Sequence, residues 1–497
     1  MRGALAVAQA TWRASRNHVV RGLGGRVPTV AVLVGVCAVV VLVNTGLYRF
    51  WSSQIGLILD SVEDAELADR LLSLLVQSSG MTAFAVALLF IALLPPRSRI
   101  ALAATLAGAH RWTVVVGEVA PVAVVSAVLA VSVQIGTLVY LVSNSPHPSL
   151  GAPALVAYLA AMSGAALVTH LGGQSLGVLL RLGDVVGRML GILVSTILLG
   201  LTAADLILAV DRQRETAVGT AWRAVWQAPV PGTGRALLGT LVVLVAAWSL
   251  LAVLCRFGAA SSTLGGFRRL GSPARWGALP WYVAQPLREL WLWIRHPVTQ
   301  VSLVLGAGMV ALVSVGVRAG VLEPGMASLV LLVVFAASAE TAHGRTAGWE
   351  WVYTSAGASP WRPLLARFGG LALVQYVLLV AALLVGVPSH LWGEALVAVS
   401  PVYLGMFGLA YLAGVAVPFS DSAPLGMFAT SFLTLALEGA LLWLELSVLG
   451  WEGAASLALN VVVCVACLVV SWAVMSARTR SRSRAASRTT VAATDAA

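Results

Sequence analysis

The chain is 497 residues long, 59% hydrophobic and only 10% charged, with a mean hydropathy of +0.92 and no lysine. Soluble globular proteins carry about 25% charged residues because their surface must be hydrated. A soluble enzyme, a disordered chain and a disulfide scaffold are therefore excluded, and a polytopic integral membrane protein is indicated. All 31 basic residues are arginines, so the chain lacks a Walker A loop, whose lysine contacts nucleotide phosphates. If ATP energises this protein, another chain hydrolyses it.

Twelve continuous apolar segments are long enough to cross a bilayer. About 20 apolar residues, each adding about 1.5 Å of helix, span the roughly 30 Å hydrocarbon layer. The segments lie at 27–48, 74–94, 113–142, 153–179, 189–210 and 236–255, and then at 298–317, 326–342, 368–387, 395–417, 424–444 and 454–476. We therefore predict an all-α polytopic membrane protein with about twelve transmembrane helices.

The distribution of arginine predicts the orientation of these helices. If the N-terminus lies inside, 24 of the 31 arginines fall in inner segments and seven in outer loops. Positively charged loops remain cytoplasmic, so we expect a multi-pass protein of the cell membrane with both termini in the cytoplasm. One outer loop, 211–235, opposes this assignment with four arginines. The net charge of +11 is explained by this topology and by anionic inner-leaflet lipid, and we expect no nucleic-acid partner.

Recurring features divide the chain into two similar parts. Tryptophan and arginine at helical spacing precede the first and seventh spans, which predicts interfacial amphipathic helices at about 4–19 and 286–296. The pattern G-A-x-x-W occurs after the second and the eighth span, ending at Trp112 and Trp361. We predict homologous six-span halves in the same orientation. The expected organisation is a first half at 1–255, a cytoplasmic linker with the second entry helix at 256–297, a second half at 298–476, and a basic tail at 477–497 that is disordered from Ala485 onward.

This order of elements resembles the ABC-2 type permeases, the membrane subunits of ATP-driven exporters, in the actinobacterial form that fuses two six-span halves. The resemblance covers nearly the whole chain. It rests on the architecture, on L-R-E-L-W-L-W-I-R-H-P at 287–297, on the basic loop Pro95–Arg99, and on a P-x-P loop before the sixth span. It implies a transport subunit without enzymatic activity that exports a hydrophobic or amphipathic drug, antibiotic, peptide or lipid.

The resemblance also implies where a partner docks. In this family the loop between the second and third spans of each half contains a coupling helix that sits in a groove of the ATPase, and the entry helix touches it too. The corresponding side chains here are Arg97, Arg99, Arg111, Trp112, Trp349, Glu350, Trp351, Tyr353, Trp361 and Arg362. The entry-helix contacts are Trp12, Arg13, Arg288, Trp291 and Arg295. The alternative interpretation is that these are arginine and tryptophan side chains of an ordinary membrane border.

The implied partners are two copies of an ABC ATPase, either identical or unequal, together with membrane lipid and the substrate. ATP and Mg²⁺ are expected on the ATPase, and this chain is expected to bind no cofactor. Neither catalytic residues nor a metal site are expected. Cys464 and Cys467 have CxxC spacing, but they lie in an apolar helix without a second pair, which favours core packing.

Ionisable residues inside spans are candidates for a translocation path. Those singled out are Glu118, His170 and Glu438, with His170 and Gln174 on one helix face. For Gln134, Gln174 and Asn460, hydrogen bonding between helices is the preferred interpretation.

Two other functions compete with ATP-driven export. An ion-coupled secondary transporter would need coupled acids or a proton relay within the spans, of which the sequence offers few. A membrane glycosyl- or acyltransferase would place catalytic acids in the first outer loop, where the sequence has five acidic residues between Asp60 and Asp69. A solvated acidic loop is the simpler explanation of that cluster.

Overall fold

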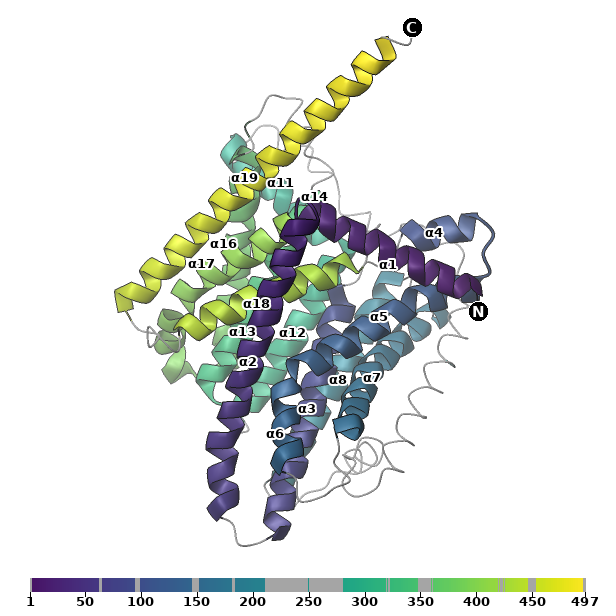
Figure 1. The fold of residues 1–497 in the computed structure, drawn as a ribbon. Helices are drawn as coiled ribbons and strands as arrows, with labels where there is room; N and C mark the ends of the chain where they lie inside the picture. The colour runs from purple at the N-terminus through teal and green to yellow at the C-terminus, as the bar shows by residue number, and fades with distance from the viewer. Residues whose placement is uncertain are drawn as a thin grey trace.

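The fold is seen in a computed structural model. It describes residues 2–61, 65–93, 99–144, 152–180, 184–210, 280–346 apart from 319 and 321, 361–445 apart from 419, 421, 422 and 424, and 453–494, together with residues 249 and 359. Within these ranges every regular element is helical. Figure 1 shows the helices as a bundle of long rods, with the shorter α1 lying across one end.

The helices of the first part of the chain are α1 (Arg2–Gly22), α2 (Arg26–Ser61), α3 (Ala65–Leu93), α4 (Arg99–Leu106), α5 (Arg111–Val133), α6 (Ile135–Asn144), α7 (Ala152–Leu179) and α8 (Asp184–Val210). Those of the second part are α11 (Trp281–Arg295), α12 (Pro297–Arg318), α13 (Pro324–Ala337), the 3-10 helix η2 (Ser338–Thr341), α14 (Ala342–Thr346), α16 (Trp361–Gly386), the 3-10 helix η4 (Ser389–Leu391), α17 (Trp392–Ala416), α18 (Gly426–Leu444) and α19 (Gly453–Thr494).

Eleven helices in the described part of the chain are long and apolar enough to cross a membrane. They coincide with eleven of the twelve predicted spans, while the predicted span at 236–255 lies, apart from residue 249, outside the described residues. Large apolar side chains such as Val34, Leu373 and Val462 lie exposed on the outside of the bundle, where lipid rather than water would contact them. The protein is therefore a multi-pass helical membrane protein.

One predicted span is wrong in form: the segment expected as a single helix at 113–142 is two helices, α5 and α6, that break at Gln134. Asn44 of α2 bridges the break. Its side-chain amide donates to the Ser132 carbonyl at 2.9 Å, and its Oδ1 accepts from the Gly136 amide at 2.6 Å. A Cβ at Gly136 would collide with the backbone of Asn44, so only glycine permits this approach. A break inside a membrane is tolerated because another helix satisfies the freed backbone groups.

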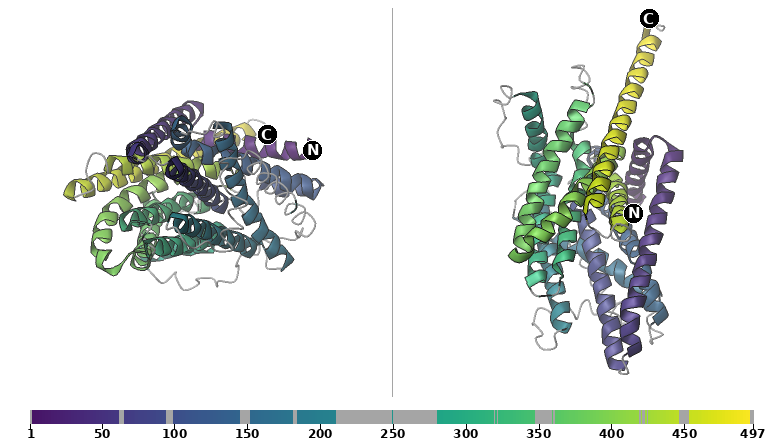
Figure 2. Two further views of the ribbon diagram at one scale, coloured as in Figure 1. Left: turned by 90° about the horizontal axis from the view of Figure 1, so that it is seen from below. Right: turned by 90° about the vertical axis from the view of Figure 1, so that its left-hand side faces the viewer.

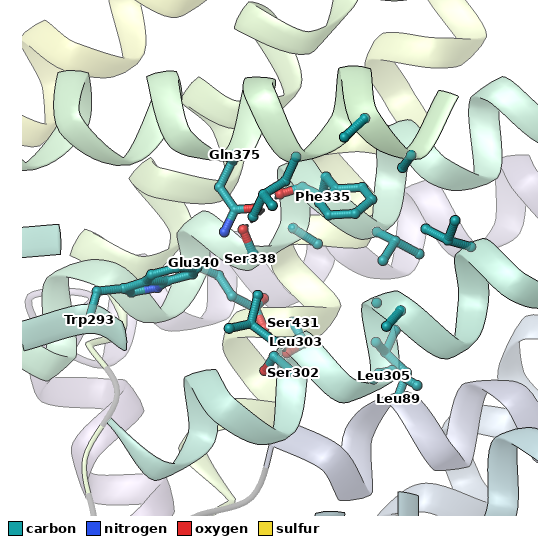
Figure 3. A pocket seen from close by; sticks show the side chains of 18 of the residues that line it. Leu89, Trp293, Ser302, Leu303, Leu305, Phe335, Ser338, Glu340, Gln375 and Ser431 are labelled. Carbon is teal, nitrogen blue, oxygen red and sulfur yellow. Dashed lines mark hydrogen bonds between the residues drawn. The ribbon is translucent and has the colours of Figure 1, made fainter. Parts of the chain in front are cut away.

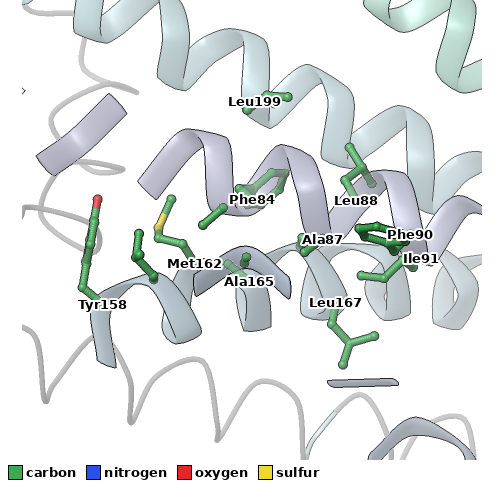
Figure 4. Close-up of a cluster of buried hydrophobic side chains, with 14 of the residues drawn as sticks. Phe84, Ala87, Leu88, Phe90, Ile91, Tyr158, Met162, Ala165, Leu167 and Leu199 are labelled. Atoms are coloured by element: carbon green, nitrogen blue, oxygen red, sulfur yellow. The ribbon is translucent and has the colours of Figure 1, made fainter. Parts of the chain in front are cut away.

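Two apolar cores hold the bundle together. The first lies mainly among α3, α5, α7 and α8, and Figure 4 shows Phe84, Leu88 and Ile91 of α3 packed against Met162 and Ala165 of α7. The second lies among α12, α13, α16, α17, α18 and α19. Val301 of α12 and Phe428 of α18 insert into the first core, and Phe428 stacks on Phe90 with ring centroids 5.3 Å apart.

The helix contacts in the two parts of the chain follow a similar order. In the first part α1 packs on α4 and α5, α3 packs on α5, α7 and α8, and α7 packs on α5 and α8. In the second part α11 packs on α14 and α16, α13 packs on α16, α17 and α18, and α17 packs on α16 and α18. Between the two parts, α8 contacts α12, and α2 contacts α18.

The C-terminal segment differs from expectation. We expected disorder from Ala485 onward, but α19 continues as a helix to Thr494. Figures 1 and 2 show this end of α19, in yellow, projecting beyond the other helices. The segment is rich in alanine and arginine, which have high helix propensity, so a helix that has already formed in the span can extend through it.

Candidate functional site

A cavity of about 360 Å³ lies within the second part of the bundle. Its walls come from α12, α13, η2, α16 and α18, with Trp293 of α11 and Leu89 of α3 contributing from outside that group. In Figure 3, Trp293 lies at one end and Leu89 with Leu305 at the other. The volume falls within the roughly 300–1,000 Å³ of small-molecule sites, and most of the lining is apolar, as in such sites.

A few polar groups are gathered at one side of this cavity. Glu340 is 1% exposed and accepts a hydrogen bond at 2.7 Å from the hydroxyl of Ser431 on α18. Gln375 of α16 lines the same cavity and is 2% exposed, and its amide has no hydrogen bond to any described residue. Figure 3 shows Gln375 and Ser338 turned toward each other across the space. The cavity therefore offers a carboxylate and an open amide in apolar surroundings.

The local fold explains why Glu340 points inward. After α13 the chain tightens into η2, and the Ser338 hydroxyl donates to the Phe335 carbonyl at 2.7 Å. Such 3-10 turns commonly end α-helices. A Cβ at Gly414 of α17 would collide with the backbone of Glu340, so this glycine lets α17 press against η2 and hold it in place.

A buried ion pair lies next to the cavity. Arg367 of α16 is fully buried, and its Nε donates to Glu289 of α11 at 3.2 Å. Its Nη1 donates to Nδ1 of His343 on α14 at 2.8 Å, so that nitrogen acts as the acceptor. Glu289 and His343 are 1% and 2% exposed. We call Glu289, His343 and Arg367 the buried triad.

The triad and the cavity share the same three segments. On α11, Glu289 belongs to the triad and Trp293, four residues later, lines the cavity. On η2–α14, His343 follows the cavity residue Glu340 by three positions. On α16, Arg367 precedes Gln375 by two turns. The triad and the cavity are therefore connected through three shared segments.

A second set of hydrogen bonds ties α1 to the other part of the chain. Arg478 of α19 donates to the carbonyls of Gly22, Val415 and Ala416 at 2.6, 2.6 and 2.8 Å, which caps the C-terminal ends of α1 and α17. His18 bonds the Pro418 carbonyl at 2.6 Å, and Ser15 accepts from the Leu425 amide at 3.2 Å. These contacts bring the C-terminal ends of α1 and α17 together beside Arg478 in the interior of α19.

The predicted entry helices both form, as α1 and α11. Trp12 and Arg13 are exposed on α1, as is Arg288 on α11. Trp291 is half-buried, with the Arg295 guanidinium 6.0 Å from its ring centre. The sequence pattern at 287–297 contains Glu289, but nothing in that pattern distinguishes this acid from its neighbours.

Few of the predicted coupling side chains lie in the described part of the chain. Trp361 stacks on Trp472 of α19 with centroids 5.4 Å apart, and Arg362 beside it is exposed. Trp112 packs against the first core. The side chains of Arg97, Arg99, Arg111, Trp349, Glu350, Trp351 and Tyr353 lie outside the described residues, as do those of the acidic loop from Asp60 to Asp69.

The three path candidates are not brought together. His170 is buried between α7 and α8, where Gln174 contacts it at 3.1 Å, and Glu118 is half-buried on α5. Glu438 is 1% exposed on α18, and both its carboxyl oxygens lack a hydrogen-bond partner within the described residues. It lies within electrostatic range of Glu340 and two turns from Ser431. Of the three, only Glu438 therefore adjoins the cavity.

Sequence reasoning missed Glu340, Gln375 and the buried triad. The available signals were an acid, Glu340, inside the predicted span 326–342 and an arginine, Arg367, immediately before the predicted span 368–387. Cys464 and Cys467 are buried in α19, and the described residues contain no group of three metal-ligating side chains.

Comparison with known proteins found no family model, no curated protein and no solved structure that matches this chain. Fold and site therefore define the protein as a multi-pass helical membrane protein with an internal cavity.

Proposed function

We propose that this protein is the membrane subunit of an ATP-driven exporter, energised by a separate ABC ATPase that binds ATP and Mg²⁺. It would move a hydrophobic or amphipathic molecule out of the cell, with both termini in the cytoplasm. The single observation that supports this function best is the shared use of α11, η2–α14 and α16 by the triad and the cavity. A transporter driven from outside the membrane needs such a mechanical connection.

The matched contacts of the two parts support an origin from two homologous six-span halves. When Trp112 is aligned with Trp361, Glu118 of α5 aligns with Arg367 of α16, since each follows its tryptophan by six residues. The first half thus has an acid at the position where the second half has the central cation of the triad. Two ATPase subunits would meet two related but unequal surfaces.

In the proposed mechanism, an ATPase bound at the cytoplasmic end displaces α11 and the segment between α14 and α16. The ion pair between Arg367 and Glu289 keeps α11 and α16 together, because separating buried opposite charges in a low-dielectric interior is costly. The displacement reaches the cavity through Trp293, Glu340 and Gln375. The cavity then changes shape without any covalent chemistry on this chain.

Purification from its native host, with an affinity tag on the C-terminus, tests this function. We expect a stoichiometric ATPase whose turnover in proteoliposomes depends on this protein. Changing Trp361 to alanine should reduce that turnover, because the loss of its stack on Trp472 loosens the start of α16. Tyr48→Ala on α2, a half-exposed aromatic residue remote from this end, is the matched control. Absence of an associated ATPase activity would refute the proposal.

An ion-coupled secondary carrier is the second candidate function. It is favoured by the electrostatic interaction between the buried acids Glu340 and Glu438. The sequence indicated Glu438 but not its closeness to Glu340. Two carboxyl groups that interact in an apolar interior could pass a proton between them. Transport by the purified protein in ATP-free vesicles with an imposed pH gradient would favour this function over the first.

A further inference from the structure

We propose that the cavity binds a membrane-dissolved apolar molecule with an uncharged primary amide, which pairs with the side-chain amide of Gln375. This inference rests on the proposed transport function and specifies the chemical class of the transported molecule. The recognition is assigned to Gln375 and is independent of the charge of Glu340.

Gln375 is a buried glutamine whose hydrogen-bonding groups are unused. Its side chain is 2% exposed, lies in the wall of the cavity and makes no hydrogen bond to any described residue. Figure 3 shows this side chain directed from α16 into the space. A buried amide without partners is costly, because it has given up its hydrogen bonds to water. A bound molecule that bonds to the amide removes that cost, so the open amide indicates a ligand.

The hydrogen-bonding capacity of Gln375 selects the group that it recognises. The hydroxyls of Ser302, Ser338 and Ser431 in the described wall already donate hydrogen bonds, two to backbone carbonyls and the third to Glu340. Gln375 offers a carbonyl oxygen that accepts and an NH₂ group that donates. A primary amide presents the complementary donor and acceptor, so one such group can bond both ends of the Gln375 amide. An ester or a ketone would leave the Gln375 carbonyl without a donor.

The rest of the described wall favours an apolar body that enters from the bilayer. Leu303 and Ala307 of α12 and Ala381 and Val385 of α16 line the cavity, and they are also exposed on the outside of the bundle. Because the outer surface of a membrane protein contacts lipid, the cavity opens between α12 and α16 toward the bilayer. A long-chain amide has no charge and partitions into the membrane, so it can reach Gln375 from the side, which a strongly hydrated solute cannot do.

The decisive experiment compares two ligands on the unaltered protein. The first is undecanamide with a dansyl group at the far end of its chain. The second has two methyl groups on the amide nitrogen, so it keeps the chain and the carbonyl but cannot donate from the amide. Binding of each to the purified full-length protein in nanodiscs, without ATPase, is measured from the dansyl fluorescence and corrected with empty nanodiscs. We expect the primary amide to bind about fivefold more tightly, as for one hydrogen bond between neutral groups. Equal affinities, or no saturable binding of the primary amide, would overturn the assignment.

A pair of variants tests whether Gln375 causes this preference. Gln375→Leu keeps a side chain of similar size without the amide, so the two ligands should bind with equal affinity. Gln174→Leu is the matched control and should retain the preference, because Gln174 is a half-buried glutamine of α7 that contacts His170 at 3.1 Å, outside the helices that form the cavity. A preference that persists in the Gln375 variant would contradict the role of this amide, since the bulk of the two methyl groups would then explain it.

A second pair of variants tests the location. Gly306 lines the cavity, and a Cβ there would find its nearest neighbour, Phe335, 4.0 Å away, so Gly306→Leu should fill the cavity and abolish binding of both compounds. Gly35→Leu places the same side chain on the exposed face of α2, where a Cβ meets open space, and should leave binding intact. Normal binding by the Gly306 variant would contradict the location. These measurements need no ATP, so their failure would leave the proposed ATPase dependence standing, and the converse also holds.

Discussion

Arg367 illustrates how much depends on single residues in an apolar interior. It is fully buried and holds together three segments that are far apart in the sequence. A buried ion pair is worth little relative to a well-packed apolar substitute, but removal of one partner leaves an uncompensated charge. The effect of mutating the Glu289–Arg367 pair on the free energy of unfolding therefore depends on whether one or both charges are removed.

We predict that Arg367→Gln lowers the free energy of unfolding by about 3–5 kcal/mol, because Glu289 remains buried without its countercharge. The double variant Glu289→Gln, Arg367→Gln should recover most of that loss. Thermal unfolding in detergent measures both, and Arg362→Gln on the exposed side of the same helix is the control. A single variant as stable as the unaltered protein would show that the ion pair does not hold α11 to α16.

Asn44 has a comparable role at the break between α5 and α6. Replacement by alanine removes the hydrogen bonds to Ser132 and Gly136, and we expect a loss of about 1–3 kcal/mol in the free energy of unfolding. Thr45→Ala is the neighbouring control, since its hydroxyl bonds only the Val41 carbonyl within its own helix. Equal thermal stability of the two variants would contradict the bridging role of Asn44.

At the scale of elements, α7 and α8 pack with their backbones almost in contact. A Cβ at Gly173 would fall 2.2 Å from the backbone of Gly191, and Gly177 faces Gly187 in the same way. Glycines spaced by four on both helices permit this approach, as at other membrane helix interfaces.

We therefore expect Gly173→Val to destabilise the protein by at least about 1–3 kcal/mol through overpacking against backbone that cannot yield. The matched variant Gly46→Val on α2 meets open space and should be tolerated. Yield of monodisperse protein and its melting temperature provide the comparison. If Gly173→Val and Gly46→Val had the same melting temperature, that result would contradict the close packing of α7 against α8.

The helices α11 and α16 should move as one body if they transmit force together. A Cβ at Gly370 would lie 3.1 Å from the Cβ of Pro286, close to the separation that a disulfide spans. In a background without native cysteines, Pro286→Cys with Gly370→Cys should form a disulfide, and ATP-driven transport should continue after oxidation. Transport that stops on oxidation and resumes on reduction would show that these helices must separate.

The sequence predicted the helices that are determined by residues close to one another in the chain. Continuous apolar runs give spans because a helix satisfies its own backbone, so eleven described spans agree with expectation. The break at Gln134 was missed because its cause, Asn44, is distant in the sequence. The triad was missed for the same reason, since Glu289 and Arg367 are 78 residues apart. The position of Glu340 depends on the close packing of Gly414 from another helix.

For the whole molecule, the two parts share a pattern of helix contacts but differ in their polar interiors. The second part has the cavity and the triad, whereas α5 in the first part has Glu118 six residues after Trp112, the spacing by which Arg367 follows Trp361. The hydrogen bonds of Arg478, His18 and Ser15 connect α1 of the first part to the second. A displacement of either entry helix would thus reach the part that contains the cavity.

The most direct test of the proposed function is ATP-driven transport of a dansyl-labelled amphipathic molecule by this protein and its proposed ATPase in proteoliposomes, with the double variant Glu289→Gln, Arg367→Gln beside the unaltered protein. The double variant has neutral side chains of similar length at positions 289 and 367, so binding of the ATPase and of the transported molecule should persist. We predict that transport falls at least about tenfold because the charged link between α11 and α16 is lost. Transport at the unaltered rate would contradict a coupling role for the triad.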